Sequence, residues 1–329
     1  MSERRVRENL THGARRRREE TSASRQMPRG VGASRRPYRI DCRLIALYVF
    51  VDDFLPKRSG PGRKPSISDA ELITLAVGQV FLDCPAERRF LRLARGRLDH
   101  LFPYIPDQSG YNKRVRALSS QICLAISLLA RSSPSFCDRL RLLDSTPVPC
   151  AQSRETVKRS ELAGHGAYGY CASHSRYFWG FRLYLVCSPD GMLHGFCLAA
   201  ANEPEREVAA ALLDRMRRTG QLHGEEIVIG DKGFAGQELE QTVRELTTGL
   251  LRPDRKNEQP RNGSLGGIRQ WIESIFDTAK DQLSLERDGG RTPGGVWARI
   301  CQRVLALAAG VWHNWQHGQP GRSFTAYDH

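Results

Sequence analysis

The chain has 329 residues, 40% of them apolar, which suffices for one or two folded domains and excludes a wholly disordered protein. It contains no uncharged apolar run long enough to span a bilayer and no signal-peptide pattern, so we expect a cytoplasmic protein. Lysine and arginine number 50 against 36 acidic residues. This net charge of +14 favours a nucleic-acid partner, although ribosome attachment or an arginine-rich proteome would also produce it.

Half of this charge lies in residues 1–37, which hold 11 Arg and 4 Glu, a net of 11 − 4 = +7. The segment has almost no apolar content and includes four consecutive arginines from Arg15 to Arg18. We therefore predict a disordered basic arm over 1–37 that grips DNA. An N-terminal extension without function explains the segment equally well.

The nine cysteines are scattered singly, with no C-x-x-C pair and no histidine at zinc-finger spacing. Most lie among apolar residues, as Cys123 does in QICLAISLL. We expect reduced, mostly buried thiols and no structural metal.

Residues 38–133 have helical periodicity and are predicted to form a helical DNA-binding region. Ser68 and Glu71 have the spacing of a capping box at the start of one helix, and a second helix is expected over 87–100. A third begins near Ser109 and carries basic residues close to its start, namely Lys113, Arg114 and Arg116. Three short helices with a basic last one are typical of a helix-turn-helix reader of DNA, but many small helical domains also have basic faces.

The pattern changes after Pro134 to alternating strands and helices. The apolar run 139–148 predicts a buried strand, and Pro189-Asp190-Gly191 predicts a hairpin turn between strands at 176–188 and 192–199. Helices at 205–218, 236–246 and 268–283 alternate with short strands at 226–229 and 250–251. The order βββαβαβα predicts an α/β domain over 134–290. The C-terminal part, 291–329, opens with a helix over 294–315, whose tryptophans are expected to pack on the core.

Three acidic residues lie at positions suited to metal binding. Asp144 interrupts the apolar run, Asp231 directly follows the strand 226–229, and Glu273 lies on the helix 268–283. Carboxylate oxygens suit Mg²⁺, and a pair of such ions clamps the attacking and leaving oxygens of a phosphoryl displacement. Arg269 and Lys280 share the face of Glu273 and can neutralise phosphate charge.

The ordered combination of these segments resembles insertion-sequence transposases of the DDE superfamily. The similar segments are 143–148 (LDSTPV), 169–173 (GYCAS), 177–183 (YFWGFRL) and 230–234 (GDKGF). Arg269, Glu273 and Lys280 match the Arg-x₃-Glu-x₆-Lys part of a signature found in many of these enzymes. Two positions depart from the pattern, because Gly266 and Phe234 stand where the family usually has tyrosine. The likeness covers roughly residues 66–315.

The resemblance implies a ribonuclease H-like α/β fold, with a mixed sheet flanked by helices. It implies cleavage of double-stranded DNA at terminal inverted repeats and strand transfer into target DNA, with two Mg²⁺ or Mn²⁺ ions. By position, Asp144, Asp231 and Glu273 would be the catalytic metal ligands. Lys280, Arg269 and Lys232 would contact DNA. The 41 residues between Asp231 and Glu273 leave no room for a large inserted β-domain.

We expect at least a homodimer in the active complex, because two DNA ends must be brought together, and no membrane partner. Two alternatives stay open. A nuclease of the same fold would hydrolyse DNA without joining it, and a recruited or decayed copy would bind DNA without cutting it.

Overall fold

The computed structural model describes residues 37–57, 65–151, 153–171, 175–247, 249–253, 273–278, 283–285, 289–319 and 321. Residues 38–329 form one compact unit. The predicted basic arm lies outside the described residues except for Pro37, where the first described helix begins. In these described ranges, no helix has both the length and the apolar character needed to cross a membrane.

The first part of the described chain is helical, as its periodicity predicts. The helices are α2 (Pro37–Phe54), α3 (Asp69–Phe81), α4 (Glu87–Arg97), α5 (Gln108–Ala117) and α6 (Ser119–Arg131). The predicted capping box is present at the start of α3. The Ser68 hydroxyl accepts the Glu71 N–H at 3.0 Å, and the Glu71 carboxylate accepts the Ser68 N–H at 2.7 Å.

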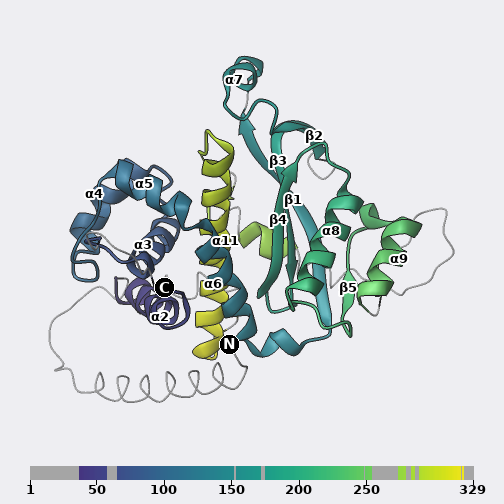
Figure 1. Cartoon of the computed structure of the whole chain (residues 1–329), viewed down its shortest axis with the longest axis horizontal. Helices are drawn as coiled ribbons and strands as arrows, with labels where there is room; N and C mark the ends of the chain where they lie inside the picture. The colour runs from purple at the N-terminus through teal and green to yellow at the C-terminus, as the bar shows by residue number, and fades with distance from the viewer. Residues whose placement is uncertain are drawn as a thin grey trace. The chain divides into compact units, whose positions relative to one another are not determined.

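The last described helix, α11 (Pro293–Gln316), lies in the centre of this unit, side by side with α6 (Figure 1). Thr292 caps it by accepting the Gly295 N–H at 3.0 Å. Two of its tryptophans pack on the core as predicted: Trp312 contacts Phe50 of α2, and Trp297 stacks on Phe196. Trp315, in the last turn of the helix, is 43% exposed and departs from that prediction.

A mixed sheet forms the other half of the unit. Its strands are β1 (Leu140–Ala151), β2 (Ala167–Cys171), β3 (Arg176–Cys187), β4 (Leu193–Ala200), β5 (Ile227–Ile229) and β6 (Gly249–Leu251). β3 runs antiparallel to β1, and its other edge pairs with β4 and β2. β5 and β6 run parallel to β1. The predicted hairpin is confirmed: Asp190 accepts the Met192 N–H at 3.1 Å, and Gly191 has a φ of +94°.

Helices cover both faces of the sheet (Figure 1). One face, which includes Leu142, Leu185 and Ile229, joins the core that contains α6 and α11. The other face packs against α8 (Glu205–Arg218) and α9 (Gln237–Leu246) through a second core. This architecture confirms the predicted ribonuclease H-like α/β class. Two short elements were not predicted from the sequence, namely β2 and α7 (Arg154–Arg159).

Candidate active site

Asp144 lies in the middle of β1 and is half-buried. Alternation along the strand puts its side chain on the same face as Leu142 and Val148, which are fully buried in the core around α6 and α11. Its Oδ1 accepts the backbone N–H of Ser145 at 2.8 Å. Burying a charged carboxylate costs free energy unless hydrogen-bond donors or a cation compensate for the lost water.

Asp231 follows β5 after one residue, Gly230, and its φ of −77° and ψ of 166° keep the backbone extended. It begins the short turn η3 (Lys232–Phe234), in which the Phe234 N–H bonds the Asp231 carbonyl at 3.0 Å. Phe234 is buried, and a Cβ on Gly230 would lie 2.9 Å from its ring. Residues 230–234 (GDKGF) therefore set the direction in which the chain leaves β5.

The strand register brings the two aspartates together. In the parallel pair, Leu142 of β1 lies opposite Ile229 of β5. Asp144 and Asp231 each lie two residues further along, so with extended backbones they face the same way from neighbouring strands. Their backbones are then about 5 Å apart, the spacing of paired strands. The two carboxylates therefore lie near the carboxyl end of β5, where ligands of α/β sheets gather. We call this part of the sheet, with Asp144 and Asp231, the aspartate edge.

Glu273 begins the described helical segment 273–278 and is exposed. Ile275 and Phe276 of this segment are buried in the same core as Leu142, on the Asp144 side of the sheet. Within the described residues, no three His, Cys, Asp or Glu side chains form a metal-binding group. The structure thus places the Glu273 segment on the Asp144 side of the sheet, and Glu273 is in no three-residue cluster of the described residues. Arg269, Lys280 and Gly266, with most of the predicted helix, lie outside the described residues.

Arg182 supports the Asp144 region from the opposite face of the sheet. Its guanidinium donates to the Ser145 hydroxyl at 3.3 Å and to the Tyr170 carbonyl at 2.7 Å, and it pairs with Glu205 of α8. It therefore connects three strands and one helix next to Asp144. Burial, reinforced by the Glu205 carboxylate, raises the pKa of the neighbouring Tyr184 hydroxyl. In the sequence, Arg182 is visible only as part of the segment 177–183 (YFWGFRL), which does not indicate these contacts.

Residues 135–309, more than half of the chain, match the family model of the transposase DDE domain. The chain belongs to this family. Among solved structures, the chain is similar to a pre-cleavage Mos1 transpososome, with 12% identity over 88% of this chain and 91% of that chain. The TM-score of 0.22 is too low to add to the family match. A search of the curated proteins finds no match.

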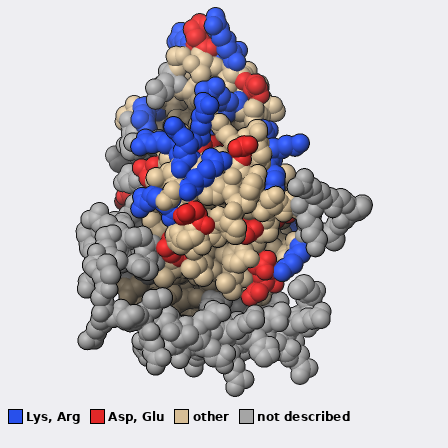
Figure 2. Space-filling view, turned by 90° about the vertical axis from the view of Figure 1, so that its left-hand side faces the viewer, with Lys and Arg blue, Asp and Glu red and all other residues tan. Residues whose placement is uncertain are grey.

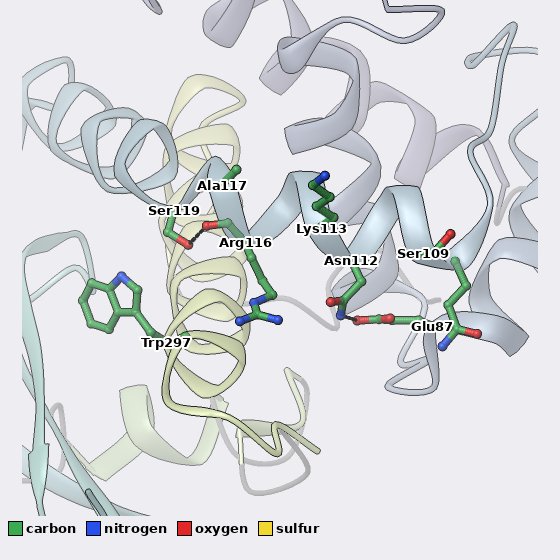
Figure 3. Close-up of a pocket in the computed structure, with 10 residues that line it drawn as sticks. Glu87, Ser109, Asn112, Lys113, Arg116, Ala117, Ser119 and Trp297 are labelled. Carbon is green, nitrogen blue, oxygen red and sulfur yellow. Dashed lines mark hydrogen bonds between the residues drawn. The ribbon is translucent and has the colours of Figure 1, made fainter. Parts of the chain in front are cut away.

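The predicted DNA-binding residues of the DDE protein fall into two environments. Lys113 and Arg116 are exposed and line a cavity of about 900 Å³ between α5 and the first turns of α11. A second cavity, of about 660 Å³, shares Arg116 and Asn112 with the first and adds three arginines, Arg88, Arg291 and Arg299. We call these two cavities the basic groove. Figure 3 shows Asn112 and Arg116 leaving one side of α5 and Lys113 another.

Positive charge also gathers on one face of the molecule (Figure 2). Figure 2 shows Lys and Arg side chains spread over the middle and upper part of this face, with fewer acidic ones between them. Glu87 lies in the groove, but its carboxylate accepts from Arg299 and Asn112, both at 2.8 Å. A phosphate backbone suits such a surface.

Arg114 is held inside the fold instead. Its guanidinium pairs with Asp69 at 2.6 Å and donates to the Ile67 carbonyl at 2.9 Å, which fixes α5 to the start of α3. Its side chain is 23% exposed. Lys232, in contrast, is exposed and immediately follows Asp231 in η3, next to the aspartate edge.

Proposed function

We propose that this DDE protein is an active DNA transposase, which cleaves DNA at the ends of a mobile element and joins those ends to target DNA. The observation that carries the proposal is the parallel pairing of β1 and β5, whose last paired residues, Leu142 and Ile229, lie two residues before Asp144 and Asp231. Membership of the transposase DDE family supports the same reading.

The residues present fit a divalent metal. Asp144 within β1 and Asp231 just after β5 supply oxygen donors, and Glu273 lies on a segment packed against the same side of the sheet. These three carboxylates would hold two Mg²⁺ or Mn²⁺ ions. When bound, the ions supply Lewis-acid stabilisation of the attacking and leaving oxygens of the phosphodiester.

The other residues orient the DNA and the carboxylates. The Ser145 N–H fixes one oxygen of Asp144, and Arg182 holds that strand from behind. Lys232, the residue after Asp231, would neutralise the phosphate next to the cleaved bond. We further propose that residues 38–133 bind the element end through Lys113 and Arg116 in the basic groove.

Further contacts belong to the same proposal. Arg269 and Lys280 would contact flanking phosphates from the Glu273 helix. Since two ends must be joined, a homodimer would hold the terminal repeats and the target together.

The deciding experiment is cleavage of a labelled duplex that carries the element's own ends, with Mg²⁺, Mn²⁺ or EDTA. The wild type is compared with Asp231→Ala and with the matched control Asp214→Ala, an acid on α8 paired with Arg218. We expect metal-dependent cleavage by the wild type and the control, and duplex binding without cleavage by Asp231→Ala. A second assay with pre-cleaved ends measures joining.

Each other outcome has a clear meaning. Cleavage without joining would identify a hydrolytic nuclease. Binding without cleavage in any metal would identify a recruited DNA-binding protein. Cleavage that survives Asp231→Ala would place the active site elsewhere.

A further inference from the structure

Three exposed tyrosines gather on the ribbon of β2 and β3, away from the aspartate edge. Tyr168, Tyr170 and Tyr177 are 55%, 47% and 77% exposed. Tyr170 lies opposite Tyr177 in the strand register, with ring centroids 5.0 Å apart, and Tyr168 lies opposite the buried Trp179. All three project from the same face of the ribbon. We call this surface the tyrosine platform.

The opposite face of the ribbon is fixed to the protein. Cys171, Phe178 and Ala201 form a small buried core there. A Cβ on Gly169 would lie 2.7 Å from the Ala201 carbonyl oxygen, so the ribbon packs closely at this point. The tyrosines therefore stand on a supported surface, which lowers the entropy cost of binding a ligand.

The platform borders a cavity of about 990 Å³. Tyr168 and Tyr177 line it together with two arginines, Arg154 of α7 and Arg176 of β3. Among the described residues, no carboxylate lines this cavity. Aromatic faces combined with arginines match a ligand that has both flat apolar rings and negative charge.

The cavity lies next to the basic groove. Gly289 and Gly290 line both this cavity and the second cavity of the groove, where Arg291 follows them. A DNA strand held by Arg116 would therefore pass from the groove onto the tyrosine platform without leaving the positively charged surface.

We propose that the tyrosine platform binds unpaired bases of a DNA strand, an inference that rests on the proposed DNA-processing function. Bases in a duplex are stacked on one another, so a tyrosine ring can stack only on a base that has left the helix. Duplex phosphates alone would need the arginines but not three exposed aromatic rings.

The charge of α7 favours DNA over a second copy of the chain. Arg154, Lys158 and Arg159 provide three cations there against one carboxylate, Glu155. A symmetric contact between two copies would bring these like charges together. A DNA strand instead neutralises them.

The platform is too far from the aspartates to take part in the chemistry. Ala151 of β1 pairs with Trp179, and it lies seven residues beyond Asp144, about 23 Å at roughly 3.3 Å per residue. This corresponds to about seven base pairs of duplex. Loss of a tyrosine should thus weaken DNA binding and leave the cleavage rate of saturated enzyme unchanged.

The test uses the full chain and three fluorescein-labelled probes, an oligothymidylate, the same strand with abasic positions, and a duplex of equal length. We expect Tyr177→Leu to weaken binding of the oligothymidylate about tenfold, because one base–aromatic stack is worth about that factor. Tyr177→Phe should bind normally, and the abasic strand should bind both variants equally weakly. Trp315→Leu is the matched control, an exposed aromatic about 27 Å along α11 from Trp297.

The remaining outcomes separate the two proposals. If Tyr177→Leu binds the oligothymidylate as tightly as the wild type does, the platform proposal is wrong, whether or not the duplex is cleaved. If the wild type does not cleave the duplex but Tyr177→Leu binds the oligothymidylate tenfold more weakly, the platform proposal holds and the transposase proposal is wrong. Sedimentation showing that Tyr177→Leu separates a dimer, with strand binding intact, would identify the surface as a subunit contact and overturn the inference.

Discussion

The aspartate edge and the basic groove are built in different ways. At the aspartate edge, β1 and β5 pair in parallel up to Leu142 and Ile229, two residues before Asp144 and Asp231. In the groove, the face of the helix on which a residue lies determines whether its side chain is exposed. Residues two positions apart can therefore have different environments. Arg116 is exposed in the groove, whereas Arg114 is bound to Asp69 within the fold. Charge in a helix therefore predicts a DNA contact only when its exposure is known.

The largest expected effect concerns the edge. Asp144→Asn should lower cleavage by at least about 100-fold, because even residues behind metal ligands are worth about 10–100-fold. Duplex binding should be unchanged. The control is Asp138→Asn, about 20 Å away at the start of β1. Equal losses in both variants, measured by single-turnover cleavage, would show that strand position does not define the site.

The groove should respond through affinity and salt dependence. The double variant Lys113→Gln/Arg116→Gln should weaken duplex binding, and the slope of log K against log salt should fall by about 2, one for each lost phosphate contact. Thermal stability should stay within about 0.5 kcal/mol, because both side chains are exposed. Fluorescence anisotropy at several salt concentrations measures the slope, and an unchanged slope would exclude both residues from the interface.

Arg114→Gln should show the reverse behaviour. Loss of its charged hydrogen bonds to Asp69 and Ile67 should lower the free energy of unfolding by about 1–2 kcal/mol, while the salt slope stays the same. Urea unfolding of Arg114→Gln, Asp69→Asn and the double variant forms a thermodynamic cycle. Strictly additive losses would contradict the pairing.

The smallest effect is expected at the cap of α3. Ser68→Ala removes the acceptor for the Glu71 N–H and should cost about 1 kcal/mol of stability. Ser120→Ala, an exposed serine near the start of α6, serves as the control and should cost less. A loss in Ser120→Ala as large as that in Ser68→Ala would mean that the cap contributes nothing specific.

Much of the fold followed from local pattern. The capping box at Ser68, the hairpin at Asp190-Gly191 and helix α8 are where the sequence predicts them, because each depends on neighbours in the chain. β2 was missed since its sequence, AYGYC, is short and contains glycine, and its strand conformation depends on pairing with β3.

The candidate site was predictable in part for the same reason. An aspartate within or just after an apolar strand is visible in sequence, so Asp144 and Asp231 could be named. The support from Arg182 could not, because its partners lie 12 to 37 residues away in sequence. The exposure of Tyr177 could not be predicted either, because its segment reads as an alternating, aromatic-rich strand in which no single aromatic stands out.

The central position of α11 has a consequence for how the chain folds. Cys123 of α6 and Cys301 of α11 are 178 residues apart in sequence, yet their sulfurs are 3.7 Å apart. The core of the early helices thus stays incomplete until the last described helix has been synthesised. Contacts between such distant segments make folding slow. A nascent chain would therefore complete its basic groove, which α11 lines, only after α11 has been synthesised.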